Sequence, residues 1–323
     1  MVCFDGLPQI CIHWSGCRGQ APEGHPAGCL YVYELMTERQ RILYWRKTQA
    51  KRNRFTKQMI REWKSVLMHQ IQPVIDEISE STIRDMEARI PQLITSDLIE
   101  PQLERNTEIV GVYFARVSFN AVSKAAGPEM IHKMGGMPTD EHWLRQVMQY
   151  LKLTAGVRIT AITDASKELA VKIIQATLQE GAAEGMGTSQ ISVLLRDNLN
   201  KQWGKFTTYR AARIARTETT MASNLGSLTG AKETGEPMLK VWLSARDSRT
   251  RRTTRGGKYE PGRYDHYGKF PMGPDGEKVE MDKPFVKTGE SLQYPGDYSG
   301  SAGNTINCRC TVTYEPIIKD EQV

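Results

Sequence analysis

Apolar residues recur at steps of three and four positions through the first third of the chain, which is the spacing of one face of a helix. The clearest series is Ile60, Trp63, Leu67, Ile71, Val74 and Ile78. Residues 37–40, Thr-Glu-Arg-Gln, are typical of a capping box that opens a helix. Pro73, Pro91 and Pro101 interrupt the pattern, so we expect several helices before about Ser118.

Helical spacing continues, with interruptions, to about residue 225. The glycines and prolines between Gly127 and Pro138 predict a loop. Residues 150–163 are rich in β-branched side chains and alternate near their end, so we expect an extended connector there. Shorter helices should follow on either side of Gly185, and residues 207–225 predict a longer one.

Glu218 falls inside the apolar stripe of that longer helix. An unpaired carboxylate in such a position is costly, and Arg249 or Arg251 could pair with it through a bidentate contact. The sequence therefore predicts a buried ion-pair network that holds the helix against a sheet: Arg216, Glu218, Asp247, Arg249 and Arg251.

Beyond Gly235 the period changes from helical to alternating. Residues 239–244 and 308–314 each alternate with a period of two, which predicts two strands, the second with both Cys308 and Cys310 on one face. We therefore expect an α+β protein. An elongated helical N-terminal region should be followed by a compact C-terminal module with a small antiparallel sheet.

Composition divides the chain into five stretches. Residues 1–35 mix Cys, Gly, Pro and His without periodicity, and we expect them to be a non-native extension, with Met36 as the natural start. The other four are a helical region that is first basic and then acidic, 36–138; a helical linking region, 139–206; a C-terminal domain, 207–316; and a short tail, 317–323.

Charge is unevenly distributed along the chain. Residues 36–70 hold ten Lys/Arg against two acids, and residues 201–258 hold thirteen against four, with an acidic stretch at 71–108. Basic blocks of this kind suit a polyanion or an acidic protein surface, although they can equally be solvated helix faces. The candidates for contact with DNA or a protein partner are Arg46, Lys47, Lys51, Arg52 and Arg54. No apolar run approaches the roughly 20 residues of a membrane span, so we expect no membrane partner.

Cys308, Cys310 and His266 form a candidate metal site, for which zinc is the natural ion. Two residues two apart in a strand point the same way, so both sulfurs could reach one ion, and Asp247 or Asp265 could complete the set. Buried thiols beside a hydrogen-bonded histidine are the alternative. A Cys–His–Asp nucleophilic arrangement, or Glu218 as a base, is a further reading, but no diagnostic motif surrounds these residues.

Residues from about 210 to 314 resemble the C-terminal domain of the Mu F-like phage head morphogenesis family. The matching segments, in the family's order, are Ala215–Thr219, Asn224, Gly235, Val241-Trp242, Asp247–Arg251, Asp265-His266, Phe285, Leu292, Tyr294–Asp297 and Asn307–Cys310. Residues 252–264 form an insertion relative to the family, in which the histidine follows the Asp-x-Arg-x-Arg element closely.

The resemblance implies a minor head protein of a tailed bacteriophage, a minor capsid protein of the virion. It implies that the protein lies inside the capsid near the portal in the virion, and in the host cytoplasm during assembly. The portal protein would be its main partner, with double-stranded DNA, scaffold or major capsid protein as further ones. Capsid assembly, DNA packaging and DNA ejection are the implied roles, and some relatives carry toxin or transferase domains beyond this module.

Two other functions remain open on the sequence. One is a metal-dependent or nucleophilic enzyme, nuclease-like or toxin-like, that acts on nucleic acid or protein. The other is a DNA-binding protein without sequence preference, which would show steep salt dependence.

Overall fold

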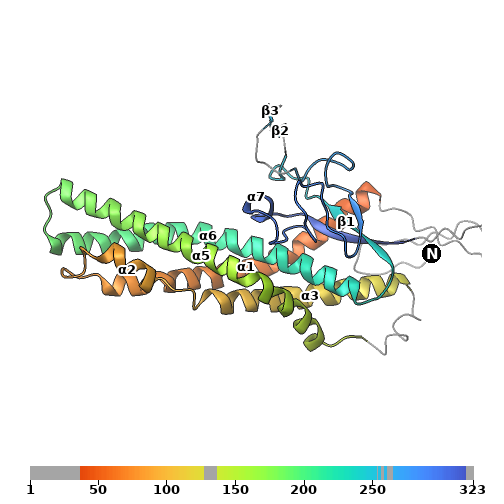
Figure 1. Ribbon diagram of the computed structural model, residues 1–323, viewed down its shortest axis with the longest axis horizontal. Coiled ribbons are helices and arrows are strands. Elements are labelled where there is room, and N and C mark those ends of the chain that lie inside the picture. Colours follow the sequence, from red (N-terminus) through yellow and green to blue (C-terminus); the bar gives the residue numbers. More distant parts are fainter. Residues whose placement is uncertain (1–36, 127–136, 253, 256–257, 260–264, 318–323) are drawn as a thin grey trace, which may run out of the picture. The chain divides into compact units, whose positions relative to one another are not determined.

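The computed structural model describes residues 37–126, 137–252, 254–255, 258–259 and 265–317. It is an α+β protein, as expected, with long helices followed by a small antiparallel sheet (Figure 1). The elements are α1 Glu38–Glu77, α2 Met86–Leu93, α3 Ile99–Ala126, α5 Asp140–Ala183, α6 Thr188–Lys232, β1 Met238–Leu243, β2 Thr254–Arg255, β3 Lys258–Tyr259, β4 Lys278–Glu280, α7 Ala302–Thr305 and β5 Thr311–Pro316. The expected extension at residues 1–35 lies outside the described residues.

The capping box at the start of α1 is confirmed. The amide of Thr37 donates to Oε1 of Gln40 at 2.6 Å, and the amide of Gln40 donates to Oγ1 of Thr37 at 3.3 Å. As expected, the chain before about Ser118 forms several helices rather than a single one. The extended connector expected at residues 150–163 is wrong, because this stretch lies within α5. Its positions Leu151, Ala155 and Arg158 are buried at helical spacing, and that packing outweighs the β preference of the residues between them.

The chain folds into two compact units, each assembled from separate segments. The helical unit comprises Asn53–Tyr113 and Asp140–Ser223, and the sheet unit comprises the described residues within 1–52, 114–139 and 224–323. Helices α1, α3 and α6 contribute residues to both units.

The helical unit has an aliphatic core that joins α1, α2, α5 and α6. Its buried members are Ile71, Val74, Ile78, Ile83, Met86, Ile90, Ile94, Ala170, Ile173, Ile174, Leu195, Leu199 and Trp203. Trp203 also donates from Nε1 to the carbonyl of Leu67 at 2.8 Å, which ties α6 to α1 within this unit. The stripe predicted from Ile60 to Ile78 thus faces the core at most of its positions, since five of its six members are buried.

The sheet unit is built around β1. This strand lies between β4 and β5 and pairs antiparallel with both, with Trp242 opposite Val312. The strand predicted at 239–244 is confirmed as β1, whereas β5 begins at Thr311, so Cys308 and Cys310 precede it. A second core gathers under the sheet: Trp242, Phe285, Leu292, Cys308, Cys310 and Val312.

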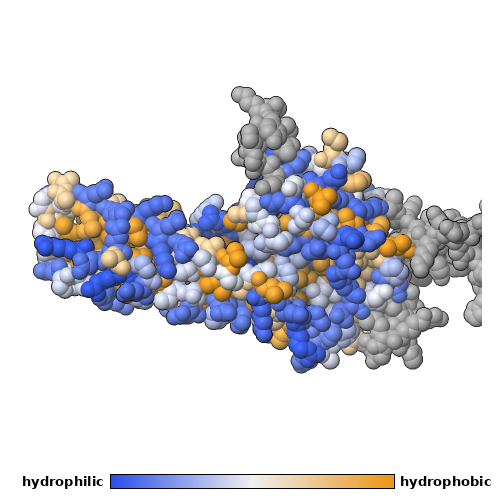
Figure 2. All heavy atoms as spheres, viewed as in Figure 1, coloured by the Kyte–Doolittle hydropathy of each residue, from blue (hydrophilic) through white to orange (hydrophobic). Residues whose placement is uncertain are grey.

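Figure 2 shows hydrophilic residues over much of the visible surface, interrupted by separate apolar spots. Two strongly exposed apolar side chains, Leu153 and Val157, lie one turn apart on α5. None of the helices in the described ranges has an apolar stretch long enough to span a bilayer.

Candidate metal centre

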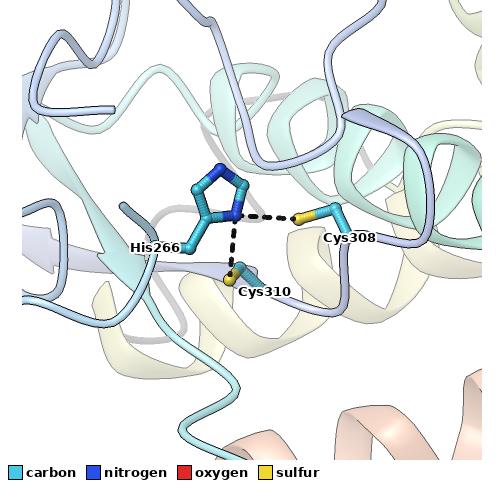
Figure 3. A group of neighbouring side chains, drawn as sticks. All are labelled: His266, Cys308 and Cys310. Atoms are coloured by element: carbon cyan, nitrogen blue, oxygen red, sulfur yellow. Dashed lines mark hydrogen bonds between the residues drawn. The ribbon is translucent and has the colours of Figure 1, made fainter. Parts of the chain in front are cut away.

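Three potential metal ligands meet in the interior of the sheet unit. Nδ1 of His266 lies 3.7 Å from Sγ of Cys308 and 3.8 Å from Sγ of Cys310 (Figure 3). The three ligand atoms lie within 4.8 Å of one another, and all three residues are buried. Tetrahedral zinc with Zn–S near 2.3 Å and Zn–N near 2.0 Å separates sulfur and nitrogen by roughly 3.5 Å. The group can therefore hold one metal ion with little rearrangement.

A chain of hydrogen bonds sets the orientation of the histidine ring. Nδ2 of Asn304 donates to Oε2 of Glu290 at 3.1 Å, and a carboxylate can only accept, so Oδ1 of Asn304 must face the opposite way. That Oδ1 lies against Nε2 of His266. Nε2 therefore carries a proton, and Nδ1 is the ring nitrogen that faces the two sulfurs. Nδ1 is then the atom that could bind a metal ion, and outer partners of this kind are usual around metal-bound histidines.

Packing and backbone contacts hold the same ring in place. Its plane stands edge-on to Trp242, with centroids 5.3 Å apart. The amide of His266 donates to the carbonyl of Arg251 at 3.0 Å, and its carbonyl accepts from the hydroxyl of Ser244 at the end of β1. His266 thus comes from the loop after the 252–264 insertion, yet it is fixed against the sheet.

The two thiols have opposite pKa shifts. The hydrogen bond from Cys310 and the neighbouring His266 lower the pKa of Cys308 well below its usual value, against the effect of burial. Burial and the adjacent Cys308 raise the pKa of Cys310 well above it. The pair therefore favours one thiolate and one thiol that share a hydrogen bond. A bound metal ion would displace the remaining proton, because thiolate is the coordinating form.

The carbonyls beside the thiols are held by a buried arginine and an asparagine. Nη1 of Arg52 donates to the carbonyl of Cys310 at 3.1 Å, and Nη2 donates to Oδ1 of Asn224 at 2.5 Å. Nδ2 of Asn224 donates to the carbonyls of Pro295 and Cys310. Burial lowers the pKa of Arg52 to about 10, while Cys308, Tyr44 and Cys310 act to raise it. The guanidinium stays charged at neutral pH and favours thiolate beside it.

Arg52 was among the residues expected to contact DNA or a protein partner, and that expectation is wrong. Its side chain is 1% exposed. The helical period of α1 turns it inward, whereas Arg46, Lys47 and Arg54 are exposed and Lys51 is half-buried. Charge alone could not separate these five, because only packing decides which face of a helix is covered.

The two aspartates considered as a fourth ligand are engaged elsewhere. Asp247 pairs with Arg309, whose Nε donates at 2.8 Å, and Asp265 accepts the amides of Tyr267 and Gly268. The hydrogen bonds and ion pair with Arg309 lower the pKa of Asp247, although burial opposes them. The metal-ligand group among the described residues therefore consists of one histidine and two cysteines.

The expected ion-pair network has other partners. Glu218 pairs with Arg158 of α5, and both side chains are 1% exposed, so the need for a buried partner was predicted but the partner was not. Asp247 pairs with Arg309. Glu218 and Arg216 belong to the helical unit, and Asp247, Arg249 and Arg251 to the sheet unit. Nε of Arg216 donates to the carbonyl of Ala212 at 2.8 Å.

The residues that sequence reasoning missed are Arg158, Asn304, Glu290 and Arg309 as a partner of Asp247. Arg158 has a signal that could have identified it, because it stands within a helical apolar pattern as Glu218 does. Asn304 and Glu290 carry no such signal, since their role depends on a fold that brings α7 and the segment of Glu290 to His266.

Comparisons with known proteins give one partial similarity. The chain is 29% identical over 134 residues to an NAD(+)–arginine ADP-ribosyltransferase of Enterococcus faecalis. The match covers 41% of this chain and 23% of that protein, so the chain spans less than a quarter of its relative. No model of a known family matches the chain, and no solved structure matches it.

Proposed function

We propose that this chain is a minor head protein of a tailed bacteriophage, located near the portal inside the capsid and acting in capsid assembly and DNA packaging or delivery. The proposal rests on the resemblance of residues 210–314 to the Mu F-like head morphogenesis family. One structural observation supports the proposal of a structural role. The motif residues are mostly buried, and several of them are bonded to one another.

Asn224 is the centre of that observation. Its amide group bonds to the carbonyl of Pro295 in the Tyr294–Asp297 segment and to the carbonyl of Cys310 in the Asn307–Cys310 segment, at 2.6 and 3.1 Å. Three segments that carry the resemblance thus converge on one buried side chain. Buried polar groups bonded in this way specify a fold. A conserved structural module would need such an arrangement, whereas a catalytic one would leave these groups open to substrate.

The similarity to the ADP-ribosyltransferase suits a shared module better than a shared activity. Less than a quarter of that protein is matched, so the rest of it can hold the activity that its name states. An assay with NAD and an arginine-containing acceptor tests this reading. Transfer of ADP-ribose by the purified chain would contradict the structural role.

Zinc is the metal we propose for the candidate centre. One imidazole and two thiolates are soft, nitrogen- and sulfur-containing ligands, which suit zinc better than magnesium or calcium. His266 follows β1 along the chain and the two cysteines precede β5, so an ion at this position would cross-link the sheet unit. The ion would supply folding free energy in this role.

The first test is co-purification with the portal protein of the same phage, at low and at moderate salt. Binding that survives moderate salt is expected, because an assembly contact should not depend on charge alone. If the folded protein does not bind the portal protein, but binds DNA with an affinity that falls steeply with salt, the result would favour the DNA-binding alternative. Mass spectrometry of purified heads provides an independent check on whether the protein is in the virion.

A matched pair of variants separates an assembly role from an enzymatic one. His266→Ala and Val312→Ala both remove buried side chains from the sheet unit, but only the first removes a metal ligand. An assembly protein should lose incorporation into heads in proportion to lost stability in both variants. An enzyme would be incorporated and inactive in the His266 variant alone.

A further inference from the structure

The middle of α6, within the helical unit, is basic and contains no acid. Residues 198–217 hold five Lys/Arg and no Asp or Glu. The acid that follows this stretch, Glu218, is buried and paired with Arg158, so it leaves the surface of the helix uncompensated. The five cations are Lys201, Lys205, Arg210, Arg213 and Arg216.

Cations and aromatic rings share one face of this stretch. Four side chains follow one another at steps of four residues: Lys201, Lys205, Tyr209 and Arg213. This spacing places them on the same face of the helix. Both lysines are exposed, the Tyr209 side chain is 61% exposed, and Phe206, three residues before it, is 48% exposed. We call these five residues the basic stripe.

The charges of the basic stripe are not neutralised from within the described part of the chain. No carboxylate there forms an ion pair with Lys201, Lys205 or Arg213. The guanidinium of Arg213 instead lies over the ring of Tyr209, with its Cζ atom 5.7 Å from the ring centroid. A ring that is stacked by a cation and still mostly exposed can accept a further flat partner.

Arg210 adds a positive charge behind the basic stripe. Its side chain is buried, and its Nη2 donates to the carbonyl of Ile162 and to the hydroxyl of Ser166, both at 3.1 Å. Both acceptors are neutral. Burial and the like charge of Arg213 lower the pKa of Arg210 to about 10, so it stays charged at neutral pH. A bound anion would relieve this repulsion between like charges.

We propose that the basic stripe binds single-stranded nucleic acid, with phosphates held by Lys201 and Lys205 and a base stacked on Tyr209. A row of cations without acids attracts a polyanion. Exposed aromatic rings suit unpaired bases, whose faces are hidden in a duplex. An acidic protein would use the cations but not the rings. The inference goes beyond the proposed function and does not depend on it, since portal binding is measured separately.

The test titrates labelled oligonucleotides with the full chain and follows their fluorescence anisotropy at several salt concentrations. Single-stranded DNA, RNA of the same sequence and a duplex of the same length are compared. We expect the single strands to bind through charge and stacking, and the duplex through charge alone. Unlabelled polyglutamate, added as a competitor, measures how far charge alone explains the binding.

Two exposed positions of the basic stripe provide variants that should fold normally, which circular dichroism checks. Tyr209→Leu keeps an apolar side chain but removes the ring. It should weaken single-strand binding roughly tenfold, the effect of one lost stacking contact, and leave duplex binding nearly unchanged. Tyr209→Trp should retain the affinity of the unmodified chain.

Lys205→Gln tests the phosphate contacts. It should reduce the slope of log affinity against log salt for single strands by about 0.7. Lys152→Gln removes an exposed cation from α5 of the same unit and is the matched control for net charge.

Each outcome supports or overturns the basic stripe. Equal affinity of Tyr209→Leu and the unmodified chain for single strands overturns it, because no base then stacks on the ring. Equal effects of Lys205→Gln and Lys152→Gln also overturn it, since they reflect net charge alone. Displacement of the strand by polyglutamate as readily as by unlabelled strand would assign the surface to an acidic protein. Binding of only DNA or only RNA supports the stripe and identifies the strand.

Discussion

Nε2 of His266 and Oδ1 of Asn304 form a buried hydrogen bond that leaves Nδ1 as the ring nitrogen facing the two cysteines. The bond has a direction, because the other end of the Asn304 amide donates to Glu290. The nitrogen that faces the two thiols is therefore the one that could bind an ion.

Replacing one thiol should remove the metal. Cys308→Ser is expected to abolish stoichiometric zinc in protein purified without chelator, and to lower the melting temperature, because the site would keep two of three ligands. Metal analysis and calorimetry measure the two effects. Val312→Ala is the control, since it should lose about 2 kcal/mol of stability by leaving a cavity yet keep its zinc. Full zinc content in Cys308→Ser would rule out the proposed ligand set.

Asn304→Ala should weaken the metal without removing a ligand. Loss of an outer hydrogen-bond partner typically costs 10–100-fold in metal affinity, and competition with a chromogenic chelator measures it. Thr288→Val removes another partner of Asn304 while leaving the bond to His266, so it should change the affinity little. If both variants bind zinc as the unmodified chain does, Asn304 has no positioning role.

Breaking the Arg158–Glu218 pair should be strongly destabilising. Both side chains are buried, so Glu218→Gln would leave a buried charge poorly compensated, at a cost of about 3–5 kcal/mol. Replacing both residues by apolar ones of similar volume should recover most of that loss. Denaturation in urea gives the free energies of unfolding, and Arg145→Met, an exposed arginine on the same helix, is the control. A change below about 1 kcal/mol in Glu218→Gln would contradict the buried pair.

Lys240 should make stability depend on alkaline pH. Burial, with a contribution from Lys232, lowers its pKa to about 8, although Asp297 and Asp282 oppose the shift. Between this pKa and the ordinary lysine value near 10.4, the unfolded chain binds a proton that the folded chain does not. The free energy of unfolding should therefore rise with pH across this window, by about 3 kcal/mol at most.

The measurement compares the unmodified chain with Lys240→Met in urea at pH 7 and pH 10. The difference in unfolding free energy between the two proteins should shift in favour of the unmodified chain at the higher pH. Nζ of Lys240 donates to the carbonyl and to Oε1 of Gln293, both at 2.9 Å, and the neutral amine keeps two N–H groups that can donate these bonds. A difference that does not vary with pH would show that Lys240 titrates normally.

The exposed basic residues of α1 should contribute to any DNA binding through phosphate contacts alone. Arg54→Gln is expected to weaken binding equally for different sequences and to reduce the slope of log affinity against log salt by about 1. Lys152→Gln, an exposed cation on α5, is the control for net charge. A change in sequence preference, or an equal effect of the control, would speak against a phosphate contact by Arg54.

The sequence by itself determined the class of the fold and the strongest local features. Helical and alternating periods depend on which side chains a single element can bury, so they identified the mainly helical first part of the chain, the capping box at Thr37 and strand β1. They did not show that Asp140–Ala183 and Thr188–Lys232 are each one long helix, because shorter helices and a connector were expected there. The burial of Glu218 followed from the same pattern, as did the nearness of Cys308 and Cys310. Each of these is a property of neighbours in the chain.

Tertiary structure decided everything that depends on distant partners. Residues 150–163 became helical because core packing outweighs local β preference. The side chain of Arg52 is buried, and Glu218 pairs with Arg158 rather than with the arginines that follow β1. Asn304 and Glu290 gained their roles because folding brought α7 and the segment of Glu290 to His266. The periodicity of a segment shows which of its faces is buried. It does not show which other element covers that face, because this depends on how all the apolar faces pack together.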